Sequence, residues 1–232
     1  MSGKKIGGAG LRGQSAGETS ICTVGVSGSG LTYRGYDIVD LAENTSFEEV
    51  AYLLLHDKLP NSQELKDYIE KLKSLRGLQP ELRSTLESIP KTAHPMDVLR
   101  TGCSVLGNLE QEEGFLNQSD HADRMLSVFP SILSYWYQFS HNGKRIDTET
   151  NDDTIGGHFL HLLHGKKPSQ LHDQVMSISL ILYAEHEFNA STFAARVCAS
   201  TLSDIHSAVT SAIGTLRGPL PVSYTHLRAH ET

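Results

Sequence analysis

The sequence predicts an all-α, multi-helical fold with a small β-hairpin near its N-terminus. Three observations favour this class. Helix start signals, each a capping side chain with a carboxylate or proline close behind, recur along the chain. Apolar residues after them follow the three-to-four-residue spacing of amphipathic helices. Runs typical of strands lie only near the start, and no alternation of strands with helices follows.

The first elements in the chain are an arm and a hairpin. Residues 1–20 are rich in glycine and serine, and we expect a flexible N-terminal arm there. Residues 21–25 and 31–34 contain β-branched and aromatic side chains and predict two strands. Residues 27–30, Ser-Gly-Ser-Gly, predict the turn, because glycine adopts the positive φ of hairpin turns at little cost.

Two capping boxes then predict two helices. Ser46 with Glu49 precedes the apolar run that begins at Val50, and Asn61 with Glu64 precedes a second run. In each box a short side chain accepts from the helix start while a carboxylate three residues later reaches back. We expect Gly77 to end the second of these helices.

Prolines at first helical positions predict the next two helices, starting at Pro80 and Pro95. A long helix is expected over 120–141, and the polar stretch 142–154 is expected to be exposed. Helices at 157–164 and 169–187 follow. The last, at 190–216, is rich in alanine and serine, which predicts a single buried and tightly packed helix.

Composition excludes several classes of function. The chain has 232 residues and a formal net charge of −7, so a polyanion such as DNA is not expected as its main partner. Its three cysteines are far apart, which indicates free thiols in a reducing compartment, either the cytoplasm or the mitochondrial matrix of a eukaryote. No apolar run approaches the roughly 20 residues that a membrane span needs, so no membrane partner is expected.

A basic cluster at 66–76 has two interpretations. It could offer an acyl-CoA a cationic surface, or it could be a solvated helix face that alternates with Asp67 and Glu70, and the second interpretation is favoured. The cluster consists of Lys66, Lys71, Lys73 and Arg76.

Three histidines at 158, 161 and 164 could suggest a metal site. On a helix the first two share a face, but the third lies about 240° around the axis from the first. Three converging ligands are therefore not available from this segment, and we expect hydrogen-bonded packing histidines and no metal.

The candidate site is the junction between the two last predicted helices. Here His186 stands between Glu185 and Glu187, followed by Asn189 and Ser191. An imidazole flanked by carboxylates tends to keep its proton, and a cationic histidine beside unpaired backbone N–H groups suits a substrate carboxylate or carbonyl oxygen. The alternative is a plain helix N-cap, at Asn189 or Ser191. The residues alone leave both interpretations open.

Longer stretches of the sequence resemble the citrate synthase family. The resemblance covers about residue 9 to Leu220, and NDDTIGGHFLHLLHG (151–165) and SHNG (140–143) resemble its 2-methylcitrate synthase branch in particular. Other matching stretches are LTYRGYDIVDLAENTSFEEVAYLLLHDKLP, AHPMDVLRTGCSVLG and the junction AEHEFNAST.

The resemblance implies an acyltransferase that condenses propionyl-CoA with oxaloacetate and water to give 2-methylcitrate and CoA, in propionate catabolism. A citrate synthase that uses acetyl-CoA is the alternative within the family, and a non-catalytic helical interaction module is the alternative of another class. The acyl-CoA is a substrate, so no cofactor is implied. The family also implies a homodimer built on antiparallel helices, among them the helix at 95–107.

By the same resemblance, His186 binds oxaloacetate and Asn189 is its close neighbour. Tyr183 then borders the pocket for the acyl group. The family also uses an aspartate base and an enol-stabilising histidine. One extra methylene in such a pocket is worth only about 1–3 kcal/mol, so strict acyl preference is not expected to be readable here.

The sequence after Leu220 departs from the family pattern. The family continues with a His-Gly-Gly motif, whereas residues 221–232 read PVSYTHLRAHET and resemble the translation of a sequencing-library adapter. We therefore expect a non-native tail at 221–232 after a partial citrate synthase-like helical domain at 21–220. The family's catalytic histidine would fall at Pro221, so the catalytic set is expected to be incomplete and this polypeptide inactive.

Overall fold

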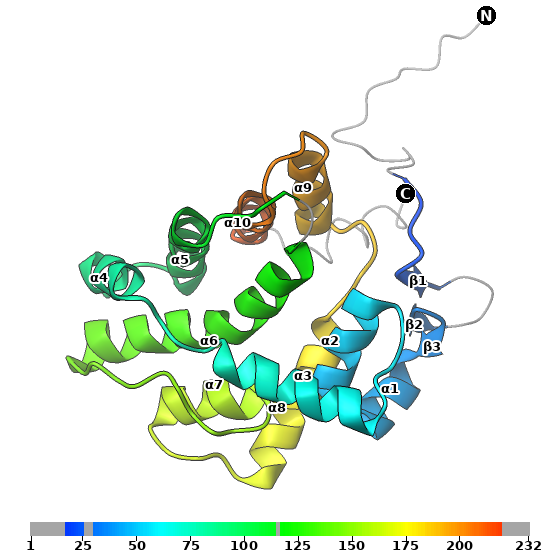
Figure 1. Ribbon diagram of the computed structural model, residues 1–232, viewed down its shortest axis with the longest axis horizontal. Helices are drawn as coiled ribbons and strands as arrows, with labels where there is room; N and C mark the ends of the chain where they lie inside the picture. The colour runs from blue at the N-terminus through cyan, green and yellow to red at the C-terminus, as the bar shows by residue number, and fades with distance from the viewer. Residues whose placement is uncertain (1–16, 26–29, 115–116, 220–232) are drawn as a thin grey trace, which may run out of the picture.

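The computed structural model describes residues 17–25, 30–114 and 117–219. Most of the expected arm, the centre of the hairpin turn and the expected tail, including Pro221, lie outside these ranges. Within them the chain is almost entirely helical, with a small sheet at one side (Figure 1). The predicted fold class is confirmed.

The sheet contains the predicted hairpin and one further strand. Strands β1 (Cys22–Val24) and β2 (Leu31–Tyr33) pair antiparallel, and Cys22 lies directly opposite Tyr33. The third strand, β3 (Tyr36–Asp37), pairs with β2 and was not predicted, because it is only two residues long. A tight turn at residues 34–35, both with positive φ, connects β2 to β3.

The helices begin where the capping signals predict. Ser46 and Glu49 form one capping box, and Asn61 and Glu64 form another. Between them these boxes satisfy backbone donors that have no partner within the helix. The helices in the first half of the chain are α1 (Ile38–Asn44), α2 (Phe47–His56), α3 (Ser62–Ser74), α4 (Pro80–Ser88) and α5 (Pro95–Leu109).

The second half contains five further helices within the described residues. They are α6 (Gln118–Asn142), α7 (Ile155–His164), α8 (Gln170–Tyr183), α9 (Ala190–Ala199) and α10 (Ile205–Leu216). Helix α3 ends at Ser74, so Gly77 does not terminate it as predicted. Instead Gly77 gives space to Glu149, whose Oε1 lies 2.9 Å from where a Cβ would be.

The sequence predicts that the stretch 142–154 is exposed, but the structure shows that part of it is buried. Thr148 and Asp152 are buried, because the segment folds back onto the end of α3. The buried guanidinium of Arg76 donates to the carbonyl oxygen of Thr150 over 2.8 Å. A polar segment can thus be buried where its polar groups find partners.

The single helix expected over 190–216 is wrong. The chain forms α9 and α10, separated by a turn in which Leu202 adopts φ 62°. Asp204 begins α10 by accepting from the backbone N–H of Ser207. The expected burial is also wrong for α9, in which no residue is fully buried, whereas α10 buries His206 and Ile213.

Two hydrophobic cores lie on either side of the long helix α6. One joins α4, α5, α6 and α10 around Leu82, Leu106 and Ile132. The other joins the hairpin, α2, α3 and the end of α8 around Tyr33 and Ile181. The second core therefore anchors the hairpin beside the junction between α8 and α9. Among the described helices none combines the length and the apolar character that a membrane crossing requires.

Candidate functional site

The three predicted site residues lie in the loop between α8 and α9 or at its two ends. Tyr183 is the last residue of α8, His186 lies in the loop, and Asn189 is the N-cap of α9. Figure 1 shows this connection running past α2 towards α9. The structure brings His186 and Asn189 onto the same short loop, at the N-terminal end of a helix, where backbone N–H groups favour negative charge.

Asn189 has a clear structural role. Its Oδ1 accepts from the backbone N–H of Thr192 over 2.9 Å and from the hydroxyl of Ser191 over 2.7 Å. The plain N-cap interpretation is therefore confirmed for Asn189. The cap also fixes where α9 begins relative to His186, which is compatible with a position beside a substrate. That substrate role stays a prediction.

Tyr183 faces outward from the end of α8. Its side chain is 88% exposed, whereas His186 is half-buried. Most of the Tyr183 ring is thus not in contact with other described residues, and its part in an acyl pocket stays a prediction.

Tyr33 lies directly beneath the loop and was not identified from the sequence. Its ring is fully buried, with 0% exposure. The hydroxyl donates towards the carbonyl oxygens of Ile181 and Glu185, at 2.9 and 3.2 Å, and accepts from the backbone N–H of Glu185 at 3.3 Å. Burial raises the pKa of Tyr33, so the hydroxyl keeps the proton that it donates.

Cys22 contacts both neighbours of His186. Its thiol donates to the carboxylate of Glu185 over 3.3 Å, and its sulfur accepts from the backbone N–H of Glu187 over 3.1 Å. Burial and the bond to Glu185 raise the pKa of Cys22 to about 12. The group is a protonated thiol at neutral pH and serves as a donor, not as a nucleophile.

The two carboxylates beside His186 are both bound to the hairpin. Glu187 accepts from the backbone N–H of Val24 over 3.1 Å, and Glu185 accepts from Cys22. Glu187 adopts φ 52°, in the left-handed region that non-glycine residues rarely occupy. The sequence had suggested that these carboxylates act on the imidazole. That effect stays a prediction, and the structure shows that both carboxylates tie the loop to the hairpin.

Two of the three histidines of α7 pack against neighbouring polar groups, as predicted, whereas His164 is exposed. His158 is buried, with one ring nitrogen 3.1 Å from Ser131 Oγ and the other 3.0 Å from Thr150 Oγ1. His161 Nδ1 lies 2.6 Å from a carboxylate oxygen of Asp152. In the described part of the chain, no three histidine, cysteine or acidic side chains gather closely enough to hold a metal ion.

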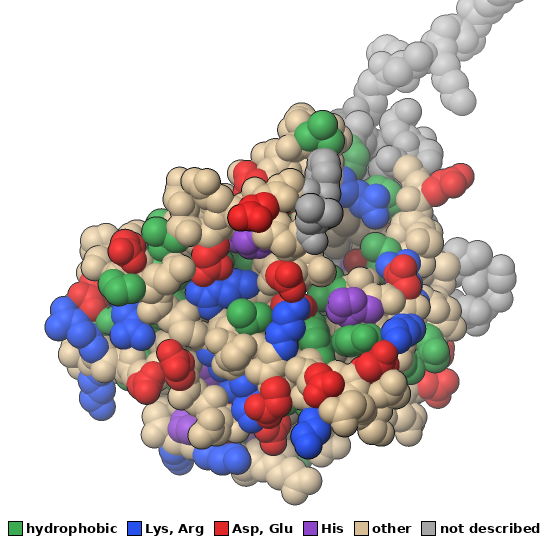
Figure 2. Space-filling view, in the orientation of Figure 1, with side chains coloured by type: hydrophobic (Ala, Val, Ile, Leu, Met, Phe, Trp, Pro, Cys, Tyr) green, Lys and Arg blue, Asp and Glu red, His purple; other side chains and the backbone are tan. Residues whose placement is uncertain are grey.

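The basic cluster at 66–76 is largely neutralised by carboxylates. Lys71 Nζ lies 2.6 Å from Asp120 and 2.7 Å from Asp123, and Lys73 bonds to Glu70 and Asp153. Arg76 is buried. On the face shown in Figure 2, Lys and Arg side chains (blue) and Asp and Glu side chains (red) are intermixed in the region where Figure 1 places α3. The arrangement favours a solvated, paired helix face over an acyl-CoA surface.

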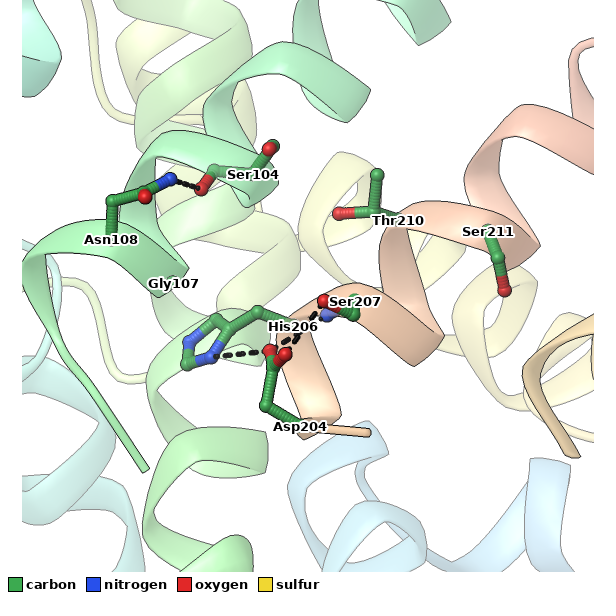
Figure 3. A pocket seen from close by; sticks show the side chains of 8 residues that line it. All are labelled: Ser104, Gly107, Asn108, Asp204, His206, Ser207, Thr210 and Ser211. Atoms are coloured by element: carbon green, nitrogen blue, oxygen red, sulfur yellow. Dashed lines mark hydrogen bonds and ion pairs between the residues drawn. The ribbon is translucent and has the colours of Figure 1, made fainter. Parts of the chain in front are cut away.

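A cavity of about 330 Å³ lies between α5 and α10, away from the three predicted residues in sequence (Figure 3). Small polar side chains such as Ser104, Asn108 and Thr210 line it, together with His206, which is 2% exposed. Burial, and then the nearby His121, lower the pKa of His206. This imidazole is therefore held neutral. No pattern in the sequence indicated the cavity.

The free thiols expected from cysteine spacing are present. Cys22 and Cys103 are buried and Cys198 is half-buried, all without a disulfide. Cys103 packs in the first core, where burial raises its pKa.

Comparison with known proteins connects this geometry to a family. Residues 10–224 match the family model described as citrate synthase, C-terminal domain. The chain is 71% identical over 217 residues to the 2-methylcitrate synthase of Shewanella oneidensis, which covers 94% of this chain and 58% of that protein. It is 41% identical to 2-methylcitrate synthase 2 of Corynebacterium glutamicum, over 91% of this chain and 57% of that protein.

Solved structures agree. The citrate synthase of Thermotoga maritima superposes with a TM-score of 0.80 at 35% identity, over 93% of this chain and 57% of that one. The citrate synthase of Thermoplasma acidophilum, solved as a ternary complex with carboxymethyl coenzyme A and oxaloacetate, gives 0.84 at 27% identity, over 91% and 56%. The chain thus spans somewhat more than half the length of these relatives. On the family model and these identities, the chain belongs to the citrate synthase family.

Proposed function

We propose that this chain is part of an acyltransferase that condenses propionyl-CoA with oxaloacetate and water to give 2-methylcitrate and CoA. The observation that carries the proposal is the 71% identity to a 2-methylcitrate synthase over 94% of the chain, a span that includes the His186 loop. Such a reaction belongs to propionate catabolism. A citrate synthase that uses acetyl-CoA is the second candidate, since relatives with that name also match.

In the proposed reaction His186 donates a hydrogen bond to the keto oxygen of oxaloacetate. This polarises the carbonyl carbon, which the enol of the acyl-CoA attacks to form the new carbon–carbon bond. Water then hydrolyses the thioester and releases CoA. The N-terminal end of α9, fixed by the Asn189 cap, adds a favourable potential for the negatively charged keto-diacid.

The remaining parts of the proposal concern the assembly and the location. Tyr183 contributes to the boundary of the acyl pocket in the complete enzyme. Two copies form a homodimer, with α5 in the interface, and the enzyme works in the cytoplasm or, in a eukaryote, in the mitochondrial matrix. The acyl-CoA enters as a substrate, and the mechanism needs no further cofactor or metal.

The test replaces His186 in a full-length enzyme that carries residues 17–219 of this chain. We expect His186→Gln to lower kcat by about 10²–10³-fold, the effect of losing one such donor, and to weaken oxaloacetate binding. His164→Gln is the matched control, because His164 is exposed at the end of α7. Unchanged oxaloacetate KM and kcat in the His186 variant would overturn the assignment of this loop.

The acyl substrate is tested by comparing kcat/KM for propionyl-CoA and acetyl-CoA in the same enzyme. One methylene in an apolar pocket supports a preference of about 10–200-fold, so we expect propionyl-CoA to be favoured within that range. A preference for acetyl-CoA selects the citrate synthase alternative. No turnover with either substrate selects a non-catalytic helical module.

A further inference from the structure

We propose that Cys22 and Tyr33 are positioning residues, which hold the His186 loop from below in the conformation that binds oxaloacetate. The proposal rests on the function given above and extends it to the N-terminal hairpin. The two residues lie directly opposite each other on β1 and β2, so one cross-strand pair supplies both supports. The hairpin and the loop are far apart in sequence but share one hydrophobic core.

Tyr33 fixes the loop where it leaves α8. Its hydroxyl reaches the carbonyl oxygen of Ile181, in the last turn of the helix, and both backbone groups of Glu185. One buried oxygen thus links the helix end to the residue just before His186. Because the ring is fully buried, water does not readily replace these bonds when the oxygen is removed.

Cys22 fixes the loop on both sides of His186. The thiol donates to the Glu185 side chain, and the sulfur accepts from the Glu187 backbone. Glu187 needs such support, since its left-handed backbone is unfavourable for a non-glycine residue. A second bond, from the backbone of Val24 to the Glu187 carboxylate, holds the same residue to β1.

The consequence is specific to one substrate. A loop released from the hairpin samples conformations in which His186 points away from the keto oxygen, and only the competent fraction binds oxaloacetate. The oxaloacetate KM therefore rises. The acyl-CoA KM stays nearly constant, because Tyr183, the residue proposed for the acyl pocket, belongs to α8 and is held by that helix.

The experiment uses Tyr33→Phe, Cys22→Ala and Cys22→Ser in the full-length enzyme. Losing a buried hydrogen bond corresponds to about tenfold in an equilibrium constant, so we expect the oxaloacetate KM to rise about tenfold in Tyr33→Phe and Cys22→Ala. Cys22→Ser keeps a donor and an acceptor at the same place and is expected to restore most of the affinity. The acyl-CoA KM is expected to stay within about twofold of the original, since none of these substitutions removes a hydrogen bond to the acyl-CoA.

Thr32→Val is the matched control. Thr32 lies next to Tyr33 on β2, and its hydroxyl pairs with Thr23, not with the loop. A second readout is amide hydrogen exchange at Glu185 and Glu187, whose N–H groups bond to Tyr33 and Cys22. Exchange at these amides is expected to accelerate in Tyr33→Phe and Cys22→Ala and to stay unchanged in Thr32→Val.

The outcomes separate the two proposals. If His186→Gln is impaired but Tyr33→Phe and Cys22→Ala keep the oxaloacetate KM and the exchange rates of the original, the positioning role is overturned and the proposed function stands. If His186→Gln is itself silent, the proposed function fails first. A variant that loses kcat in proportion to its unfolded fraction, with both KM values unchanged, shows a merely structural role and also overturns the positioning role.

Discussion

His158 is enclosed by α6, α7 and the segment before α7, with a hydroxyl on each ring nitrogen. Burial and the nearby Arg76 lower its pKa from an ordinary value to about 3. In the unfolded chain the same imidazole takes up a proton near pH 6.5. Between these two values the unfolded state binds more protons, so the free energy of unfolding falls as the pH falls, by about 1.4 kcal/mol per pH unit for one such group.

We therefore expect stability to be lost progressively from about pH 6.5 downward, starting above the range in which most carboxylates titrate. Urea unfolding at a series of pH values measures the slope. His158→Gln removes the titrating group and keeps a polar atom near Ser131. In this variant the free energy of unfolding should depend less steeply on pH, by the contribution of about one proton. Identical slopes in the variant and the original chain would contradict the neutral, buried state of His158.

Gly107 is the second residue with a sharply defined environment. A Cβ at this position would lie 2.7 Å from the Cβ of His206, which α10 packs against α5. Gly107→Ala is expected to destabilise the chain by about 1–3 kcal/mol, because either helix must shift to make room. Gly214→Ala is the matched control. Its nearest neighbour would be Arg100 Cδ at 3.7 Å, so helix propensity alone acts there and favours alanine by up to about 1 kcal/mol.

Both variants are measured by urea unfolding of the same chain. We expect the free energy of unfolding to fall in Gly107→Ala and to rise in Gly214→Ala. Equal stability of the two alanine variants would show that α5 and α10 do not pack as closely as the structure has them.

At the scale of the elements, the sequence is informative where local chemistry decides. The boxes at Ser46 and Asn61 predicted the starts of α2 and α3, since capping bonds form within four residues. The break between α9 and α10 was missed because no glycine or proline marks it, although Asp204 with Ser207 is a capping pair that could have been recognised. The short strand β3 offers too few residues for any pattern.

The same distinction applies to the candidate site. The junction at His186 was found because its unusual residues are adjacent in sequence. The hairpin contacts of Cys22 and Tyr33 were missed, since each joins residues that lie about two-thirds of the chain apart, and their partners include backbone atoms that carry no sequence signal. Only the tertiary packing of the second core brings them together.

Leu202, in the turn between α9 and α10, gives a test at this scale. Its left-handed backbone, φ 62°, is unfavourable for leucine, and its side chain is 76% exposed and buries little apolar surface. Leu202→Gly is expected to stabilise the chain by up to about 1 kcal/mol, the relieved strain being partly offset by a more flexible unfolded state. Val197→Gly, inside α9, should destabilise it by a few tenths of a kcal/mol, approximately the difference in helix propensity. Thermal unfolding distinguishes the signs, and destabilisation by both would contradict a strained turn.

At the scale of the whole molecule, apolar side chains are distributed unevenly. The two cores beside α6 bury many of them, but α8 also presents exposed apolar residues along one side. Leu171, Val175 and Leu182 follow one another at helical spacing, so they lie on one side of α8 as a stripe of exposed apolar residues. An exposed stripe of this kind favours association, because burying it against another apolar surface removes it from water.

We expect the 232-residue chain to associate increasingly with concentration, through the stripe on α8. Leu171→Lys combined with Val175→Lys places two charges on the stripe and should shift the chain towards monomers, because burying a charge without a partner is costly. The control is His172→Lys with Gln174→Lys, two exposed positions on the same helix that lie off the stripe. Sedimentation velocity over a concentration series measures the outcome. If both double variants dissociate equally, net charge and not the stripe governs association. If the original chain is monomeric at every concentration, the stripe is too small to drive association.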